Sequence, residues 1–132
     1  QTLFGEHLIK VPQFANKTIG IVESEKTAII CSLFLPSLLW MATGSMCNVQ
    51  TDRMEAVKNR HVILYPDTDP GALAFRKWNE RANELNRLGW HIQVSEYLER
   101  IATPEQRKQK IDVADLLVEN LQAHRITHKN SS

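Results

Sequence analysis

Four short hydrophobic runs are separated by longer stretches in which apolar and polar positions are mixed. The runs cover residues 18–22, 38–42, 61–65 and 90–95. Each run is bounded by glycine, proline or polar residues, and none is long enough to favour a helix. This pattern predicts four buried strands.

The stretches between the runs predict helices. The clearest spans residues 71–88, where apolar residues recur at steps of three and four: Phe75, Trp78, Ala82, Leu85 and Leu88. An apolar helix over residues 25–35 has Ser24 as a candidate N-cap and ends at Pro36. A short helix is predicted within residues 49–58. A last helix turns four apolar residues inward, namely Val113, Leu116, Leu117 and Leu121.

Two segments carry weaker signals. Residues 3–9 predict a short helix packed on the outside. The polar stretch 99–110 carries four cations, Arg100, Arg107, Lys108 and Lys110. A solvated loop is the default interpretation of this stretch, and a patch for backbone phosphates is the alternative. The expected organisation is a helical extension at 1–17, a domain at 18–124 and a flexible polar tail at 125–132.

Alternation of strands and helices predicts an α/β fold with an open parallel sheet, right-handed crossovers and helices on both faces. Glu23 follows the first strand, and Asp67 and Asp69 follow the third. These carboxylates can share an ion only if the two strands are neighbours, since adjacent strands lie ~4.8 Å apart. The expected strand order is therefore 2-1-3-4, with the acids at its switch point.

Composition changes this picture little. The chain has 132 residues, of which 42% are hydrophobic, and a formal net charge of +1, so one domain is expected and charge neither supports nor excludes nucleic acid. Cys31 and Cys47 form no paired motif, and Cys31 is expected in the core, which favours a reducing, cytoplasmic setting. No membrane contact or secretion is predicted. Because the sequence begins at Gln1, further domains of a longer parent protein are expected.

The acidic residues suggest metal chemistry, because hard oxygen ligands favour Mg²⁺ or Mn²⁺ and phosphate substrates. Local turn chemistry is the competing explanation. Asp69 precedes Pro70, as a helix N-cap does, and Asp67 is a common turn residue. Capping does not explain why Glu23, after the first strand, is expected at the same sheet edge as the two aspartates. The metal interpretation is therefore favoured.

Three motifs together resemble the Toprim domain of primases, topoisomerases and some nucleases. They are Val-Glu-Ser-Glu-Lys-Thr-Ala at 22–28, Ala-Thr-Gly at 42–44 and Tyr-Pro-Asp-Thr-Asp-Pro-Gly at 65–71. The resemblance covers residues 18–121 and is nearest to the primase-like type of phages, mobile elements and bacterial replicative primases. It implies that Glu23, Asp67 and Asp69 bind the catalytic metal. Ser24 departs from the glycine usual in the first motif.

Further residues are candidates with alternatives left open. Lys26 is a candidate for phosphate binding or a solvated lysine, and Thr43 with Gly44 and Ser45 either contacts phosphate or forms a turn. The resemblance also suggests a further acidic ligand, Asp112 or Asp115. Asp112 is more simply a helix cap, whereas for Asp115 the metal and helix-dipole interpretations are equally favoured.

The resulting hypothesis is primase-like nucleotidyl transfer or phosphodiester chemistry in DNA replication or mobile-element maintenance. Nucleic acid and nucleoside triphosphates are the expected partners, and Glu23 is also a candidate general acid or base. A Toprim nuclease and a non-catalytic scaffold that binds DNA or a replication partner are alternatives. A phospho-receiver domain fits less well, because no fifth strand is evident. The tryptophans at 40, 78 and 90 are predicted in the core, and His124 and His128 in the tail.

Overall fold

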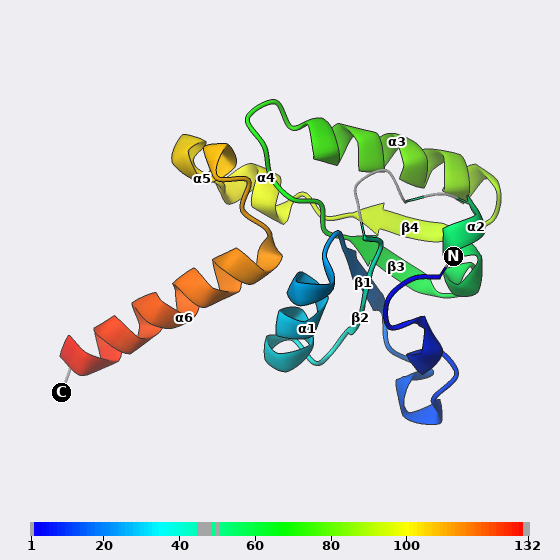
Figure 1. Ribbon diagram of the computed structural model, residues 1–132, viewed down its shortest axis with the longest axis horizontal. Coiled ribbons are helices and arrows are strands. Elements are labelled where there is room, and N and C mark those ends of the chain that lie inside the picture. The colour runs from blue at the N-terminus through cyan, green and yellow to red at the C-terminus, as the bar shows by residue number, and fades with distance from the viewer. Residues whose placement is uncertain (1, 45–48, 50, 131–132) are drawn as a thin grey trace.

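A four-stranded parallel sheet forms the centre of the protein, whose computed structural model describes residues 2–44, 49 and 51–130 and side chains as far as residue 123 (Figure 1). The strands are β1 (Ile19–Val22), β2 (Leu39–Ala42), β3 (His61–Leu64) and β4 (His91–Val94). Their order is β2-β1-β3-β4, and all neighbouring pairs are parallel. This confirms the predicted α/β class and strand order.

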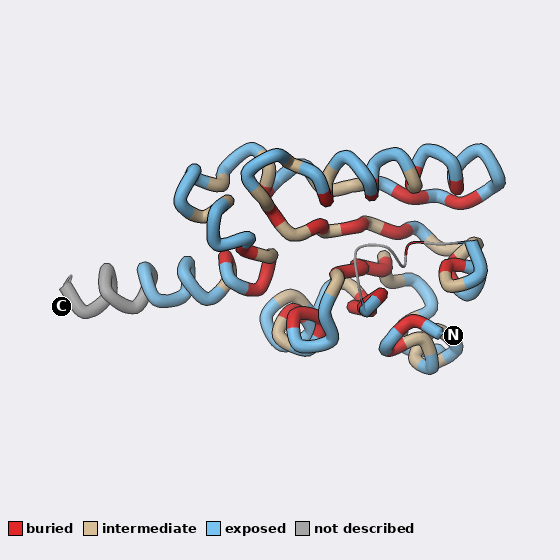
Figure 2. Tube along the Cα trace, turned by 45° about the horizontal axis from the view of Figure 1, so that its top comes forward, coloured by how far each residue is buried: buried red, intermediate tan, exposed pale blue. Residues whose placement is uncertain are grey.

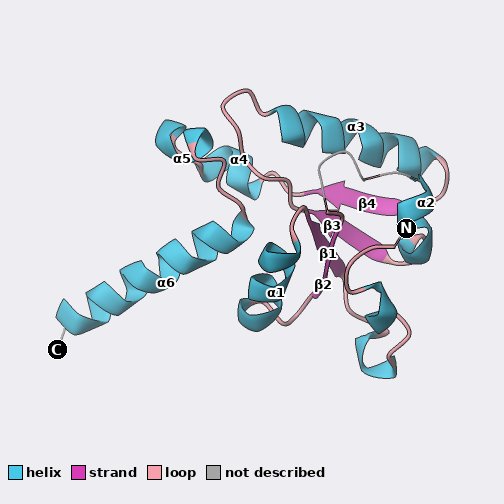
Figure 3. Ribbon diagram, viewed as in Figure 1, coloured by secondary structure: helices cyan, strands magenta, loops and turns pink. Residues whose placement is uncertain are grey.

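Helices lie on both faces of the sheet, also as predicted (Figure 3). They are α1 (Glu25–Phe34), α2 (Thr51–Met54), α3 (Leu73–Arg87), α4 (Tyr97–Ile101), α5 (Pro104–Lys108) and α6 (Val113–Asn130), with 3₁₀ turns η1 (Glu6–Leu8), η2 (Pro12–Phe14) and η4 (Glu55–Val57). Helix α6 continues through residues 125–130, where the sequence favours a flexible tail. Along the part of the chain that is described, no helix combines the length and hydrophobicity needed to cross a bilayer.

One face of the sheet is covered by α3, whose apolar stripe supplies Trp78, Ala82 and Leu85. These side chains pack on alternate residues of the strands, among them Ile21 and Leu64, which are both fully buried. Figure 2 shows the buried positions concentrated on the strands and on the inner sides of the helices. The helical periodicity therefore identified the inward positions of Trp78, Ala82 and Leu85. Leu88, predicted on the same face, follows the last residue of α3 and is 60% exposed.

The other face is covered by α1 and the start of α6. Trp40 of β2 lies across Gly20 of β1, and a Cβ added to Gly20 would stand 2.7 Å from two ring carbons of Trp40. Trp40 is fixed there by an indole N–H that donates to the Leu35 carbonyl at 2.9 Å. Cys31 is buried in the same cluster, as predicted, and burial followed by the charge of Asp112 raises its pKa to about 12.

The N-terminal segment departs from its predicted place on the outside. Leu3 is only 2% exposed and belongs to the core under α3. Phe4 exchanges two backbone hydrogen bonds with Ala42, at 3.0 and 3.2 Å, and so covers part of the outer edge of β2. The short helix itself is present as η1. Because an apolar residue directly before a short turn has no periodicity to mark it, the pattern did not reveal its burial.

The polar stretch 99–110 is not the open loop that its composition favours, because it includes α5 and the end of α4. Thr103 accepts a hydrogen bond from the Gln106 N–H at 3.1 Å, and the Gln106 side chain accepts one from the Thr103 N–H at 2.9 Å. With Pro104 at the first helical position, this is a capping box. Arg107 then pairs with Glu99 at 2.8 Å and joins the two helices.

The outer edge of β4 is closed by a side chain of α3. The Asn86 amide donates to the Ile92 carbonyl and accepts from the Ile92 N–H, both at 2.8 Å. Asn86 thereby occupies the position of a neighbouring strand, which protects an edge that would otherwise pair with other chains.

Candidate functional site

Glu23 and Asp67 lie side by side because β1 and β3 are adjacent in the sheet. Glu23 follows the last residue of β1, and its carbonyl accepts a hydrogen bond from the Gly44 N–H at 2.8 Å. The chain after β3 continues along the sheet, since the Tyr65 N–H donates to the Ile21 carbonyl at 2.8 Å. Both carboxylates thus reach the carboxyl edge at the switch point, where open α/β sheets bind ligands.

Asp67 is the most perturbed carboxyl of this edge. Burial, then the charges of Glu23 and Asp112, a side-chain hydrogen bond with Glu23 and the charge of Asp115 raise its pKa from 3.8 to about 8. The protein therefore gathers like charges around a half-buried acid. Such an arrangement stabilises a bound proton or a bound cation, and it marks functional sites more often than ordinary surfaces.

Asp69 is committed to the start of α3. Its Oδ1 accepts from the Gly71 and Leu73 N–H groups at 3.0 and 2.8 Å, and its Oδ2 accepts from the Ala74 N–H at 3.0 Å. Burial acts to raise the pKa of Asp69, but these bonds and Lys110 outweigh it and lower the pKa. The capping role predicted from the sequence is confirmed, although the helix begins at Leu73 and not directly at Pro70.

Asp112 and Asp115 form a reciprocal cap at the start of α6. The Asp115 N–H donates to Asp112 Oδ1 at 2.9 Å, and the Asp112 N–H donates to Asp115 Oδ2 at 3.0 Å. This confirms the cap interpretation of Asp112. Asp115 uses one oxygen in the same cap, and its role as a metal ligand stays a prediction.

A hydroxyl pair connects this cap to the first motif. Thr27 Oγ1 donates to Asp112 Oδ2 at 2.7 Å, and the same Oγ1 lies 2.7 Å from Ser24 Oγ. Because the single Thr27 hydroxyl proton is used on Asp112, Ser24 is the donor in the second bond. Ser24 Oγ also accepts from the Thr27 N–H at 3.1 Å and caps α1. The starts of α1 and α6 are therefore fixed to each other beside Glu23.

A cavity of about 360 Å³ opens at this edge. It is lined by the three acids that the sequence singles out, together with Lys110 and parts of the loop that leads into α3: Glu23, Asp67, Thr68, Asp69, Pro70, Leu73, Ala74 and Lys110. Lys110 is the one cationic residue in that described lining, and its backbone is left-handed with φ 53°. The described lining of the cavity thus combines three carboxylates with one cation.

These residues fit a hydrated divalent cation. Among the described residues, no three His, Cys, Asp or Glu side chains are grouped so that they form a metal site by themselves. Mg²⁺, however, usually keeps several waters and takes only one or two carboxylates together with substrate phosphates. Burial first, and then the neighbouring charge of Glu23, raises the pKa of Asp67, and a cation bound at this pair would favour the ionised form of both carboxyls. Asp69, whose oxygens already accept three bonds, fits better as a fixed neighbour than as a first ligand.

The three residues predicted to bind phosphate differ in their exposure to solvent. Lys26 is exposed in the first turn of α1, whereas Thr43 is only 1% exposed and its N–H donates to the Val22 carbonyl at 3.0 Å. Gly44 is exposed with φ 87°, a left-handed conformation that favours glycine. Of these three, none lines the acidic cavity. Ser45 and Cys47, like the side chains of His124 and His128, lie outside the described residues.

The family assignment rests on the first half of the chain. Residues 1–68 match a family described as a domain of unknown function (DUF6371). The chain belongs to this family. The DUF6371 match spans β1, β2, β3 and both Glu23 and Asp67, whereas Asp69 and Lys110 lie beyond it. No curated protein and no solved structure matches the chain.

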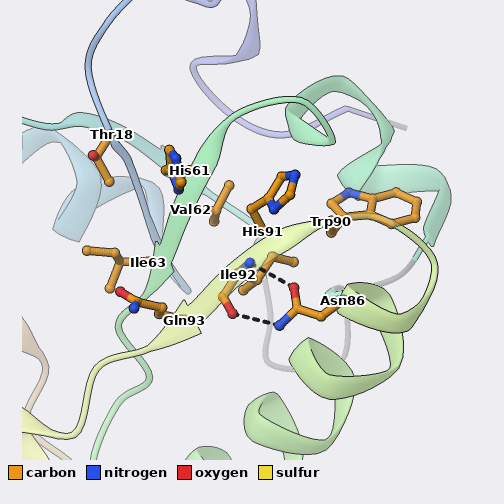
Figure 4. A pocket seen from close by; sticks show the side chains of 9 residues that line it. All are labelled: Thr18, His61, Val62, Ile63, Asn86, Trp90, His91, Ile92 and Gln93. Carbon is orange, nitrogen blue, oxygen red and sulfur yellow. Dashed lines mark hydrogen bonds between the residues drawn. The ribbon is translucent and has the colours of Figure 1, made fainter.

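A second cavity, of about 500 Å³, lies at the opposite end of the strands (Figure 4). His61 and His91 stand at paired positions of β3 and β4, with ring centroids 5.9 Å apart. The described residues that line this cavity include no carboxylate, and the two histidines are the only ionisable side chains among them. Both histidines are exposed. The acidic cavity is therefore the better candidate in this DUF6371 protein.

Three residues of the site escaped the sequence analysis. Thr27 and Thr68 are buried threonines whose partners lie 85 and 43 residues away, so no local pattern marks them. Lys110 belongs to a basic stretch of the sequence, and its left-handed backbone and its place in the cavity follow from the path of the chain between α5 and α6.

Proposed function

We propose that this protein is a metal-dependent nucleic-acid enzyme domain of the primase-like Toprim type, with Glu23 and Asp67 holding Mg²⁺ or Mn²⁺. One observation carries the proposal: two carboxyls from adjacent parallel strands meet at the switch point, and the pKa of Asp67 is raised to about 8 there. Buried like charges of this kind cost stability unless a cation is bound, so a structural role alone explains them poorly.

A bound cation would polarise a phosphoryl oxygen and stabilise the charge that develops on a leaving group. The protein residues around it have separate tasks. Asp69, fixed by three backbone N–H groups, keeps the loop that carries Asp67 in place. Lys110, which lines the same cavity, is suited to a substrate phosphate. Asp67 holds a proton at neutral pH and releases it when a cation is bound.

The favoured reaction is nucleotidyl transfer in primer synthesis, within DNA replication or mobile-element maintenance, with nucleic acid and nucleoside triphosphates as partners. Hydrolysis of nucleic acid uses the same groups with water as the nucleophile. The resemblance of residues 22–28, 42–44 and 65–71 to primase-like Toprim motifs supports the first reaction.

A non-catalytic scaffold is the second candidate, and a specific observation favours it. Carboxylate oxygens of Asp69 and Asp115 already accept hydrogen bonds from backbone N–H groups. The Glu23–Asp67 pair is therefore left as the principal candidate for metal binding, which is a small ligand set for a catalytic site. A scaffold would bind DNA or a replication partner without turning over a substrate. The scaffold hypothesis predicts that the protein does not bind Mn²⁺ or Mg²⁺ at millimolar concentrations.

The deciding experiment measures primer synthesis and nuclease activity on single-stranded DNA, with nucleoside triphosphates and either Mg²⁺ or Mn²⁺. Asp67→Ala is expected to abolish metal-dependent activity while circular dichroism shows an intact fold. Glu80→Gln, which removes a carboxylate from the exposed side of α3, is the matched control and is expected to retain activity. Full activity in Asp67→Ala would overturn the assignment.

A further inference from the structure

Thr68, the residue between the two aspartates of the third motif, is buried and bound to a distant part of the chain. Its N–H and its hydroxyl both donate to the Ile111 carbonyl, each at 2.9 Å. Only 1% of Thr68 is exposed, so its hydroxyl has no access to water in place of this partner. The two bonds use both lone pairs of the Ile111 carbonyl and fix the loop against it.

Ile111 lies between two residues of the acidic site. Lys110, immediately before it, lines the same cavity as Glu23, Asp67 and Asp69. Asp112, immediately after it, accepts the Thr27 hydroxyl and caps the start of α6. The Ile111 side chain is 4% exposed and packs in the core under α1 and α6. Whatever fixes the Ile111 carbonyl therefore also fixes both of its neighbours relative to Asp67.

We propose that Thr68 is a positioning residue whose hydroxyl sets the separation between the Asp67 loop and the Lys110–Asp112 segment, and so prepares the site for a divalent cation. This inference rests on the proposed function and deepens it. It explains why a threonine, with a donor on its side chain, stands at a buried position between two acids. An apolar residue of the same size would fill the space and leave only the backbone bond to hold the segment.

A purely structural role for Thr68 makes a different prediction. It would lower the melting temperature on substitution and leave the affinity for a cation unchanged. Asn86 provides the matched control, because its side chain also makes two hydrogen bonds to one residue, Ile92, at the far end of the sheet. Loss of those bonds in Asn86→Ala should destabilise the fold without changing the arrangement of Glu23 and Asp67.

The test is calorimetric titration of Mn²⁺ into the wild-type chain and the variants Thr68→Val, Thr68→Ser and Asn86→Ala, with melting temperatures measured in chelator. Thr68→Val is expected to lose roughly 10-fold to 100-fold in Mn²⁺ affinity, the usual effect of removing an outer support of a metal site. Thr68→Ser retains the hydroxyl and is expected to bind as the wild type does, and so is Asn86→Ala.

The possible outcomes distinguish failure of the Thr68 positioning role from failure of the proposed metal-dependent function. Wild-type affinity in a folded Thr68→Val protein overturns the positioning role and leaves the proposed function intact. A loss of Mn²⁺ affinity of roughly 10-fold or more in Thr68→Ser, measured against the wild type, also overturns it. This comparison decides the matter if Thr68→Val does not fold. Absence of Mn²⁺ binding in the wild type overturns the proposed function together with the inference.

Discussion

Replacing Asp67 by asparagine should stabilise this protein in the absence of metal, and increasingly so as the pH rises. Asparagine keeps the shape of the side chain but removes its ionisation. In the folded protein the pKa of Asp67 is raised from 3.8 to about 8 by burial and by neighbouring carboxylates, Glu23 first among them. Ionisation of Asp67 therefore opposes folding.

The sign follows from proton linkage. Because the folded protein holds this proton more tightly than the unfolded chain, the stability associated with it is complete below about pH 4 and is lost as the pH rises through about 8. A shift of this size corresponds to at most about 6 kcal/mol. Asp67 is partly exposed and its charge is screened, so we expect a difference on the order of 2–3 kcal/mol above pH 8.

Urea unfolding in chelator at several pH values between about 4 and 9 measures this difference. The Asp67→Asn protein should match the wild type in acid and exceed it progressively up to about pH 8. Glu80→Gln removes an exposed charge and should show no such trend. If the difference between Asp67→Asn and the wild type does not depend on pH, the account of the acidic edge is wrong.

Two further substitutions test the supports of the site. Asp69→Ala should cost about 1–2 kcal/mol of stability, because it removes the acceptor of three backbone N–H groups at the start of α3. Since the pKa of Asp69 is lowered in the folded protein, this cost should shrink in strong acid, and an unchanged urea midpoint at neutral pH would argue against the cap. Gly20→Ala should cost about 1–3 kcal/mol, because the new Cβ would stand 2.7 Å from the fixed ring of Trp40. A melting temperature equal to that of the wild type would show that the ring moves aside easily.

Much of the fold was predictable because its signals are local. Periodicity marked the inward face of α3, and Gly89, with φ 110°, ends that helix as expected. The strand order followed from a single physical requirement, that Glu23 and Asp67 share one edge. Segments that depend on specific caps were harder to predict. The polar composition of residues 99–110 favours a loop, but the capping box of Thr103 and Gln106 starts a helix there.

The site was predictable only in part, for a related reason. Glu23 and Asp67 stand at strand ends, where the chain direction and the sheet order fix their positions. Thr68 and Lys110 depend on how the segment before α6 returns to the third motif, which is a contact between distant residues. Asp69 served two interpretations in the sequence, and its hydrogen bonds confirm the capping one.

The most direct test of the central claim is the proton released when Mn²⁺ binds. Calorimetric titrations in buffers of different ionisation enthalpy count this proton. Because Asp67 holds a proton near neutral pH, Mn²⁺ binding should release about one proton at pH 7 and almost none at pH 9.5. Asp67→Asn should bind Mn²⁺ more weakly and release no proton at either pH. Failure of the wild-type protein to bind millimolar Mn²⁺, or binding without pH-dependent proton release, would contradict a cation site at Glu23 and Asp67.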